Sequence, residues 1–286
     1  MRNSSVDIRP VTANTGAEIH GIDLKEPLSD GAYREIRHAL VDRGVLFFRD
    51  QHLTPDQLLA VGRRFGDLHV SKFAAKVPGH PQVCEVRKEP ETTRNIGGQW
   101  HTDHAYADKP PLGSILQAQE LPEVGGDTLF ANMCAAYDGL SDGLKKTLAG
   151  LRAVHAKSKA LDPSKLAAER RVSAEELSKM TPDNVSRQAI HPVTPLHPES
   201  GRRILFVSPT YTVRFEGWTA AESEPLLQYL YQHALRPENT CRFHWRVGSI
   251  AFWDNRTSWH LALNDYQGER RLMHRVSVQG PGFAAS

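Results

Sequence analysis

Two stretches, Gln99-Trp100-His101-Thr102-Asp103 and, far downstream, Trp253-Asp254-Asn255-Arg256-Thr257-Ser258-Trp259-His260, carry the most informative pattern of the chain. They supply His101, Asp103 and His260 as one set of metal ligands. Two imidazoles and one carboxylate can occupy one face of an octahedral iron(II) ion and leave three positions open for a co-substrate and dioxygen. A His-x-Asp triplet also recurs by chance, because the chain holds 14 histidines. The pattern predicts a redox enzyme, provided that further residues agree with it.

A second pattern follows His260 by eleven positions, where the segment from Arg271 to Gln279 is typical of a β-strand. Alternate side chains of a strand share a face, so Arg271 and Arg275 point the same way. If that face is buried, both guanidinium groups need anions, because an unpaired buried charge is costly. Their planar fork suits carboxylates, sulfonates and phosphates. The alternative is a solvated face, on which both arginines pair with nearby acids such as Glu269.

With these residues in place, the chain resembles the taurine/2,4-dichlorophenoxyacetate dioxygenase family of iron(II)- and 2-oxoglutarate-dependent enzymes. The resemblance extends from about Ile8 to Gly280 and keeps both order and spacing. It includes Gly16-Ala17-Glu18-Ile19-His20-Gly21-Ile22-Asp23-Leu24, Phe65-Gly66-Asp67-Leu68-His69, Trp100-His101-Thr102-Asp103, Gly125-Gly126-Asp127-Thr128-Leu129, Trp253-Asp254-Asn255-Arg256 and Arg271 to Arg275.

The resemblance implies a role for each matching residue. It makes His101, Asp103 and His260 the ligands of Fe(II), so that the same three residues form the metal-binding and the catalytic set. Thr128 and Arg271 would hold the distal carboxylate of 2-oxoglutarate, and Arg275 falls where relatives bind the anionic group of the prime substrate. Dioxygen would convert 2-oxoglutarate to succinate and carbon dioxide while a C–H bond is hydroxylated.

Two neighbouring details refine this expectation. Relatives that halogenate lack the carboxylate of Asp103, so its presence favours hydroxylation. His104 follows the metal motif directly, and we expect a pocket or surface histidine there rather than a further ligand, because the facial set is already complete.

The fold that the resemblance implies is a double-stranded β-helix, or jelly roll, mainly β with helices packed outside. Local patterns agree with it. Helices are expected over 31–43, from Thr54-Pro55 toward Phe65, over 133–151 with an interruption at Ser141-Asp142, and over 219–235. Strands are expected over 44–48, 82–86, 114–119, 151–155, 190–195, 240–245, 249–253 and 271–279. The polar segment 157–187 is a long insertion of the kind that forms a lid, a binding loop or a locally disordered segment. Because an insertion at this place covers the active site in the family, the resemblance implies a lid; the alternative is a surface excursion without a function.

Composition agrees with one enzyme domain over residues 1–286. A hydrophobic fraction of 40% is enough for a sizeable core. The formal charge of +2 is spread along the chain, so neither nucleic acid nor a membrane is expected as a partner. Cys84, Cys134 and Cys241 are too few and too far apart for a disulfide framework, which favours a cytoplasmic location. The oligomeric state is left open, a homo-oligomer included.

Two rival functions share part of the pattern. A zinc-dependent hydrolase would use the same three ligands to hold zinc and a water of lowered pKa. That function gives Thr128, Arg271 and Arg275 no task. A non-catalytic jelly-roll binding protein would lack a ligand or an anion-binding arginine, and none is missing. The sequence therefore favours the oxygenase.

The substrate is inferred from departures within the resemblance. Taurine-specific relatives carry a histidine, a tyrosine and an asparagine where this chain has Ser71, Ala74 and Gly97. Leu161 replaces a phenylalanine, and Tyr211 replaces another aromatic residue. Because most of these changes remove volume or polar groups, we expect a small anionic substrate bulkier than taurine. An aryloxyalkanoate, an alkyl sulfate ester or a longer sulfonate would suit, with Arg275 as its anchor and Ser71, Gly97 and Tyr211 around it.

Overall fold

The computed structural model describes residues 6–70, 74–160 and 186–283. Ser71, Leu161 and most of the predicted lid at 157–187 lie outside the described residues. The strands are β1 (Asp7–Pro10), β2 (Ala17–His20), β3 (Val45–Phe48), β4 (Lys76–Val77), β5 (His80–Lys88), β6 (Gly113–Glu120), β7 (Thr128–Asn132), β8 (Arg152–Ala156), β9 (Gln188–Pro192), β10 (Thr212–Phe215), β11 (Thr240–Phe243), β12 (Ile250–Asp254), β13 (Ser258–Ala262) and β14 (Arg271–Val278). The helices are α1 (Asp30–Arg43), α2 (Pro55–Arg63), α3 (Met133–Asp138), α4 (Asp142–Leu148), α5 (Lys157–Ala160) and α9 (Ala220–Ala234), with a short 3-10 helix η1 (Pro237–Asn239).

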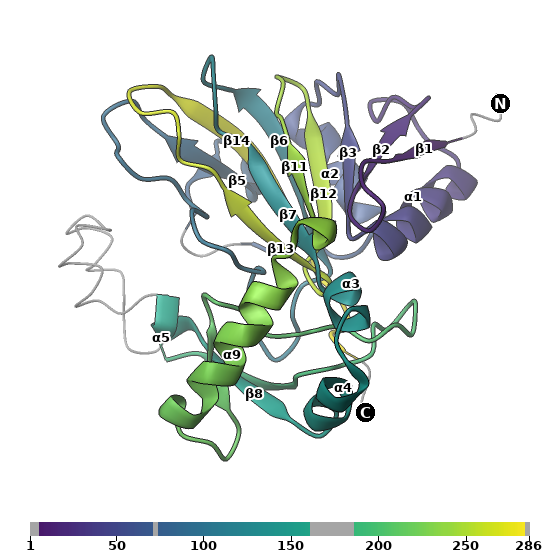
Figure 1. Cartoon of the computed structure of the whole chain (residues 1–286). Helices are drawn as coiled ribbons and strands as arrows, with labels where there is room; N and C mark the ends of the chain where they lie inside the picture. Colours follow the sequence, from purple (N-terminus) through teal and green to yellow (C-terminus); the bar gives the residue numbers. More distant parts are fainter. Residues whose placement is uncertain (1–5, 71–73, 161–185, 284–286) are drawn as a thin grey trace.

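The largest sheet has eight strands in the order β1-β2-β3-β12-β6-β14-β5-β4, and it fills the upper half of Figure 1. Its pairs are antiparallel except β2 with β3, which are parallel. β3 lies inside this sheet and is buried along its whole length. Covering on both faces explains why its sequence is continuously apolar and does not alternate.

A second sheet, in the order β11-β7-β13, packs against the inner face of the first. Phe47 of β3 stacks on Phe243 of β11 with ring centroids 4.1 Å apart, and meets Phe130 of β7 edge to face at 5.6 Å. These aromatic contacts between the sheets form the inner core. The described strands therefore make a β-rich sandwich, to which a small third sheet, β10-β8-β9, is added.

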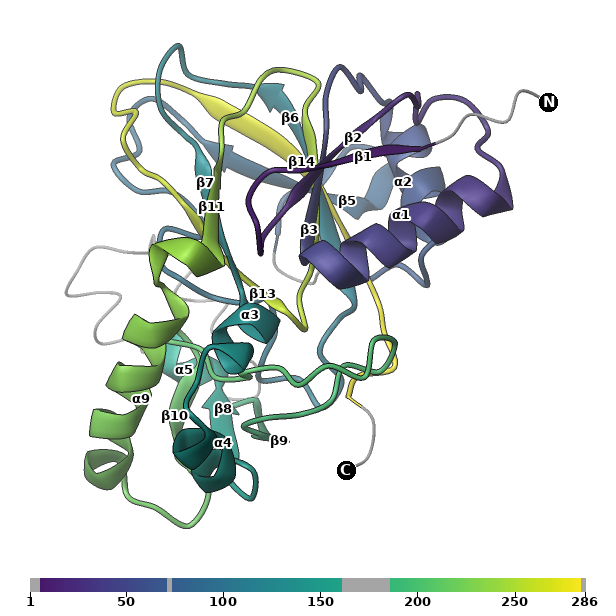
Figure 2. The same cartoon turned by 45° about the vertical axis from the view of Figure 1, so that its right-hand side comes forward.

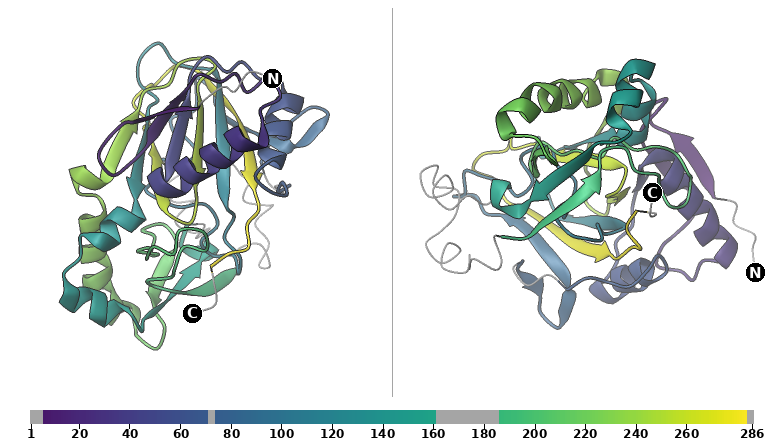
Figure 3. Two further views of the ribbon diagram at one scale, coloured as in Figure 1. Left: turned by 90° about the vertical axis from the view of Figure 1, so that its right-hand side faces the viewer. Right: turned by 90° about the horizontal axis from the view of Figure 1, so that it is seen from below.

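Helices α1 and α2 cover the outer face of the large sheet (Figures 2 and 3). The predicted cap at Thr54 is present, because its hydroxyl accepts from Gln57 N–H while the Gln57 side chain accepts from Thr54 N–H. In α1, Ile36 and Leu40 are fully buried against the sheet. Gly44 ends this helix with φ 75°, a conformation that costs glycine little. The prediction of a mainly β protein with outer helices is confirmed.

The region 133–151 forms two helices, α3 and α4, because Ser141 caps the second by accepting from Leu144 N–H. Together with α9 they surround a separate apolar cluster in the lower half of Figure 1.

None of the helices in the described parts of the chain combines the length and the apolarity that a membrane crossing requires.

Candidate active site

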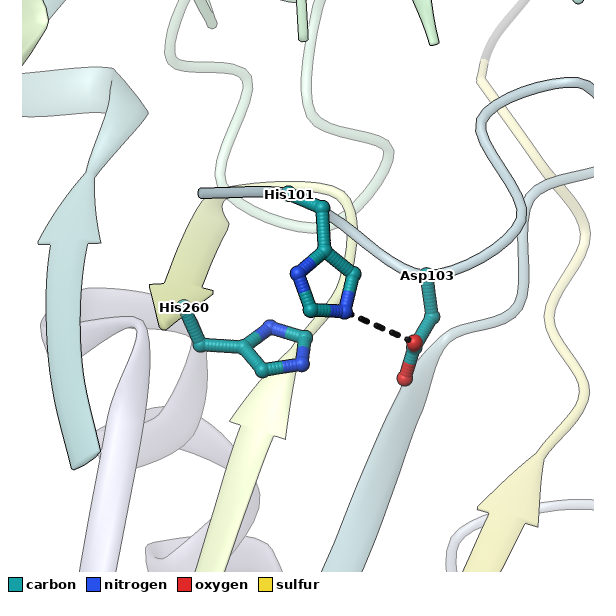
Figure 4. Close-up of side chains that lie close together, drawn as sticks. All are labelled: His101, Asp103 and His260. Carbon is teal, nitrogen blue, oxygen red and sulfur yellow. Dashed lines mark ion pairs between the residues drawn. The ribbon is translucent and has the colours of Figure 1, made fainter. Parts of the chain in front are cut away.

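Backbone pairing brings the two motif stretches together. His260 lies in β13, and His101 forms an isolated antiparallel bridge with it. His101 N–H donates to the His260 carbonyl at 3.1 Å, and His260 N–H donates to the His101 carbonyl at 2.8 Å. On its other side β13 pairs with β7. A local strand pair therefore places both imidazoles on one side of the backbone (Figure 4).

The three predicted ligands converge. His101 Nε2 lies 3.6 Å from Asp103 Oδ1, and the rings of His101 and His260 are 4.1 Å apart. One ligand atom from each of the three residues lies within 4.8 Å of the others, and all three residues are buried. Among the described residues, no other group of three histidine, cysteine or acidic side chains meets this criterion. Nitrogen and carboxylate donors without a thiolate suit Fe(II), Mn(II) or Zn(II).

The protonation states also suit a metal. The backbone oxygen of Gln99 lies 2.7 Å from His101 Nδ1, so this nitrogen donates to it and Nε2 is the nitrogen that faces Asp103. Burial, with His101 next, lowers the pKa of His260 well below its usual range. For Asp103, burial would raise the pKa, but Arg275 and the two histidines hold it well below the usual range. A neutral His260 and an ionised Asp103 are the forms of these two residues that bind a cation.

Arg271 lies on the inner face of β14 and is only 4% exposed. Its Nε and Nη2 are buried and have no partner among the described residues. Burial lowers its pKa, an effect that nearby Tyr266 and Asp127 oppose. The solvated-face alternative is thus wrong for Arg271; it describes Arg270, which is 39% exposed and pairs with two glutamates. An orphaned buried guanidinium fits a carboxylate ligand.

Thr128, the first residue of β7, belongs to the same region of the site. Its hydroxyl oxygen lies 2.9 Å from Trp245 Nε1, and both side chains are buried. Because an indole nitrogen only donates, the threonine oxygen accepts and keeps its own proton for another acceptor. The Arg271 guanidinium carbon lies 5.8 Å from the centre of the Trp245 ring. Trp245 therefore links the two residues that the resemblance assigns to 2-oxoglutarate.

Arg275 lies beside the ligand cluster. Its Nη1 is 3.6 Å from Asp103 Oδ1, its side chain is 20% exposed, and its Nε is buried without a partner among the described residues.

Met273 packs in the inner core whereas Val276 packs beneath the outer helices, so the predicted alternation of β14 is confirmed.

The structure describes some of the other predicted pocket residues but not all of them. Gly97 has φ 82°, and a Cβ there would lie 3.4 Å from His101 Cε1, so its lack of a side chain leaves room beside His101. Tyr211 meets the ring of Tyr106 edge to face at 5.1 Å. Ser71 is outside the described residues, and Ala74 is half-buried.

A polar pair that no sequence pattern indicated lies beside Asp103. The Tyr106 hydroxyl lies 2.9 Å from Nδ1 of His104, and the His104 ring meets His69 at 5.7 Å. Burial lowers the pKa of His104 to about 4, so its ring is neutral near pH 7. His104 has φ 54°, a backbone conformation that is uncommon for residues other than glycine. Residues in such conformations cluster at functional sites. The spacing His-x-Tyr is too common to have indicated this contact.

Comparison with known proteins agrees with this geometry. Residues 7–277 match the model of the family described as taurine catabolism dioxygenase TauD, TfdA family. An alpha-ketoglutarate-dependent sulfate ester dioxygenase of Pseudomonas putida is 33% identical, covering 96% of this chain and 90% of the relative. An alpha-ketoglutarate-dependent 2,4-dichlorophenoxyacetate dioxygenase of Cupriavidus pinatubonensis is 32% identical, covering 96% and 98%. The crystal structure of a putative alpha-ketoglutarate-dependent taurine dioxygenase from Burkholderia xenovorans is 37% identical, with a TM-score of 0.83 and coverage of 98% and 95%.

Proposed function

The chain belongs to the taurine catabolism dioxygenase TauD, TfdA family, and we propose which of its residues perform the reaction of that family. It is an iron(II)- and 2-oxoglutarate-dependent dioxygenase, an oxidoreductase that uses dioxygen. The rival zinc hydrolase and non-catalytic binding protein are not supported by these relatives. For the fold, we propose the jelly roll of a single domain, supported by two facing sheets and by the likeness to the Burkholderia enzyme. A cytoplasmic location stays a prediction.

The metal is held by His101, Asp103 and His260 in this proposal. The observation that carries it is the convergence of one ligand atom from each residue within 4.8 Å, in a buried position. Iron(II) bound there would supply the activation of dioxygen that oxidises 2-oxoglutarate and the C–H bond of the substrate. The protein's own part is to hold these ligands ionised or neutral as required and to keep three metal positions open.

Arg271 and Thr128 hold the distal carboxylate of 2-oxoglutarate. The buried guanidinium offers two unpartnered nitrogens, and the threonine hydroxyl offers the proton that Trp245 leaves free. Together they provide charge and direction at one end of the co-substrate. Its keto-acid end would face the metal.

The prime substrate is a small organic anion whose charged group binds Arg275. Support comes from the unpartnered Nε of this arginine and from its place beside Asp103. Gly97 and Tyr211 line the same site in this proposal, and Ser71 is a further predicted contact. We propose hydroxylation of an aryloxyalkanoate, an alkyl sulfate ester or a sulfonate bulkier than taurine. Hydroxylation beside an ether or ester oxygen would give an unstable product that cleaves into a carbonyl compound and a phenol, alcohol or sulfate.

A succinate-release screen tests this function. Purified full-length protein is supplied anaerobically with Fe(II) and 2-oxoglutarate, then with oxygen and paired anionic and neutral candidate substrates. His101→Ala, Asp103→Ala and His260→Ala should each abolish release, whereas His244→Ala, at a histidine whose side chain is 68% exposed, should leave it unchanged. Zinc should inhibit by occupying the same ligands. Full turnover with zinc in the absence of oxygen would refute the assignment.

A further inference from the structure

The two oxygens of Asp103 face different groups. Oδ1 lies 3.6 Å from His101 Nε2 and 3.6 Å from Arg275 Nη1, so it faces the candidate metal position. Oδ2 accepts a hydrogen bond from the hydroxyl of Ser114 at 2.9 Å. Ser114 lies in β6 and is fully buried. One carboxylate oxygen is therefore directed to the cluster, and the other is held by the sheet.

Two further hydrogen bonds stand behind Ser114. Trp253 Nε1 donates to Asn255 Oδ1 at 2.7 Å, and Asn255 Nδ2 donates to the Ser114 hydroxyl at 3.3 Å. The donors and acceptors in this row of hydrogen bonds are fixed at both of its ends. An indole N–H only donates, which fixes the oxygen of Asn255 toward Trp253 and its NH2 toward Ser114. Ser114 accepts there, so its single proton goes to the ionised carboxylate, which only accepts.

We call these hydrogen bonds the Trp253–Asn255–Ser114 relay. The position of the relay in the fold makes it rigid. Ser114 and Trp253 are register partners in the paired strands β6 and β12. Asn255 follows β12 directly, is 1% exposed, and its carbonyl accepts from the Thr102 hydroxyl between the two ligands His101 and Asp103. Because the relay is buried, water cannot replace a lost bond at low cost. The same network thus connects the sheet core to Thr102 and Asp103 of the His-x-Asp motif.

We propose that the Trp253–Asn255–Ser114 relay restricts Asp103 to a single metal-binding oxygen. The inference rests on the proposed role of Asp103 as a ligand and adds Ser114 and Asn255 as positioning residues. An octahedral ion that holds two imidazoles and one carboxylate oxygen keeps three positions, two for the keto acid and one for dioxygen. A carboxylate free to turn could bind through both oxygens and would occupy one of these positions. Holding Oδ2 by hydrogen bonding keeps the dioxygen position open.

Water-proton relaxation of the full-length protein loaded with Mn(II) tests this directly, because it reports how many exchangeable waters the ion carries. Ser114→Ala frees Oδ2, and we expect the variant to lose one of three metal-bound waters, about a third of the inner-sphere effect. With Fe(II), we expect kcat to fall by about 10- to 100-fold, the usual range for such outer contacts. The KM for 2-oxoglutarate should change little, since Arg271 and Thr128 are untouched.

Three further variants separate positioning from folding. Ser258→Ala removes another buried strand hydroxyl, which donates to the Gly44 carbonyl at 2.8 Å, and should leave metal-bound water and kcat unchanged. Ser114→Thr keeps the hydroxyl and should restore the wild-type water count. Asn255→Asp keeps the acceptor for Trp253 but offers Ser114 a second acceptor, so it should reproduce the defect if Ser114→Ala does not fold.

The outcomes distinguish this inference from the proposed function. If wild type binds Mn(II) and folded Ser114→Ala shows the same bound-water count and kcat, the relay inference is overturned while the ligand assignment stands. If Asn255→Asp also matches wild type, the relay has no positioning role in either half. If wild type itself shows no chelator-sensitive Mn(II) binding, the proposed metal site fails, and the relay inference fails with it.

Discussion

Replacing Arg271 by methionine should change the stability of the free protein and its affinity for 2-oxoglutarate in opposite directions. The guanidinium is 4% exposed, and two of its nitrogens lack a partner among the described residues. An apolar side chain of similar length removes that desolvated charge. By analogy with buried ion groups replaced by hydrophobic residues, we expect the free energy of unfolding without ligand to rise by about 1 to 4 kcal/mol.

The affinity of Arg271→Met for 2-oxoglutarate should fall. Removing one partner of a buried charge pair costs about 2 to 5 kcal/mol, which corresponds to a dissociation constant about 30- to 4000-fold higher. At a concentration 100 times the wild-type dissociation constant, a ligand stabilises a protein by about 2.7 kcal/mol. The same concentration should stabilise Arg271→Met by about 0.9 kcal/mol or less.

Calorimetry of the Mn(II)-loaded proteins with 2-oxoglutarate, and denaturant unfolding with and without it, measure both quantities. Arg270→Met is the matched control, because this neighbour is 39% exposed and pairs with Glu89 and Glu120 on the surface. It should alter neither value appreciably. Equal 2-oxoglutarate affinity in wild type and Arg271→Met would refute the assignment. A large loss of stability in the free Arg271→Met protein would show that its charge is compensated after all.

Three further outcomes are expected. Thr128→Val removes the hydroxyl that Trp245 orients and should weaken 2-oxoglutarate binding by about 0.5 to 1.5 kcal/mol in the same calorimetry. Arg275→Ala should raise the KM of an anionic substrate but spare 2-oxoglutarate, because four residues of strand separate it from Arg271 by about 13 Å; equal use of neutral and anionic analogues would contradict this. Asp254→Asn should destabilise the protein at pH 7 by about 1.5 to 3 kcal/mol, because it removes one of the two carboxylates that pair with buried Arg256 and leaves only Glu199. Burial would raise the pKa of Asp254, but Arg256 and His197 hold this pKa below its usual range. The stabilisation by the ionised carboxylate is therefore present above about pH 4 and is lost as the pH falls further. In denaturant unfolding from pH 7 to 3, the free energy of unfolding should fall more steeply for wild type than for Asp254→Asn.

The sequence alone was sufficient where chemistry or a local signal dictates the residue. The candidate ligand set His101, Asp103 and His260 could be proposed from the sequence because few residue types bind iron(II) and their order resembles that of a family, and the structure brings the three side chains together. Helices α2 and α9 were predictable because Thr54 and Thr219 each begin a complete capping box followed by an amphipathic run. The buried strand β3 was evident from its continuous apolar residues.

Tertiary structure decided what depends on contacts between distant residues. β7 and β13 are short strands that no sequence pattern predicted. They are defined by pairing with each other, yet they carry Thr128 and His260. Arg270 and Arg271 are identical as residues, and only packing makes one a surface cation and the other a buried, unpartnered charge. The bond from Ser114 to Asp103 joins a strand to a loop through the fold. These contacts join residues that lie far apart in the sequence, so no local pattern along the chain indicated them.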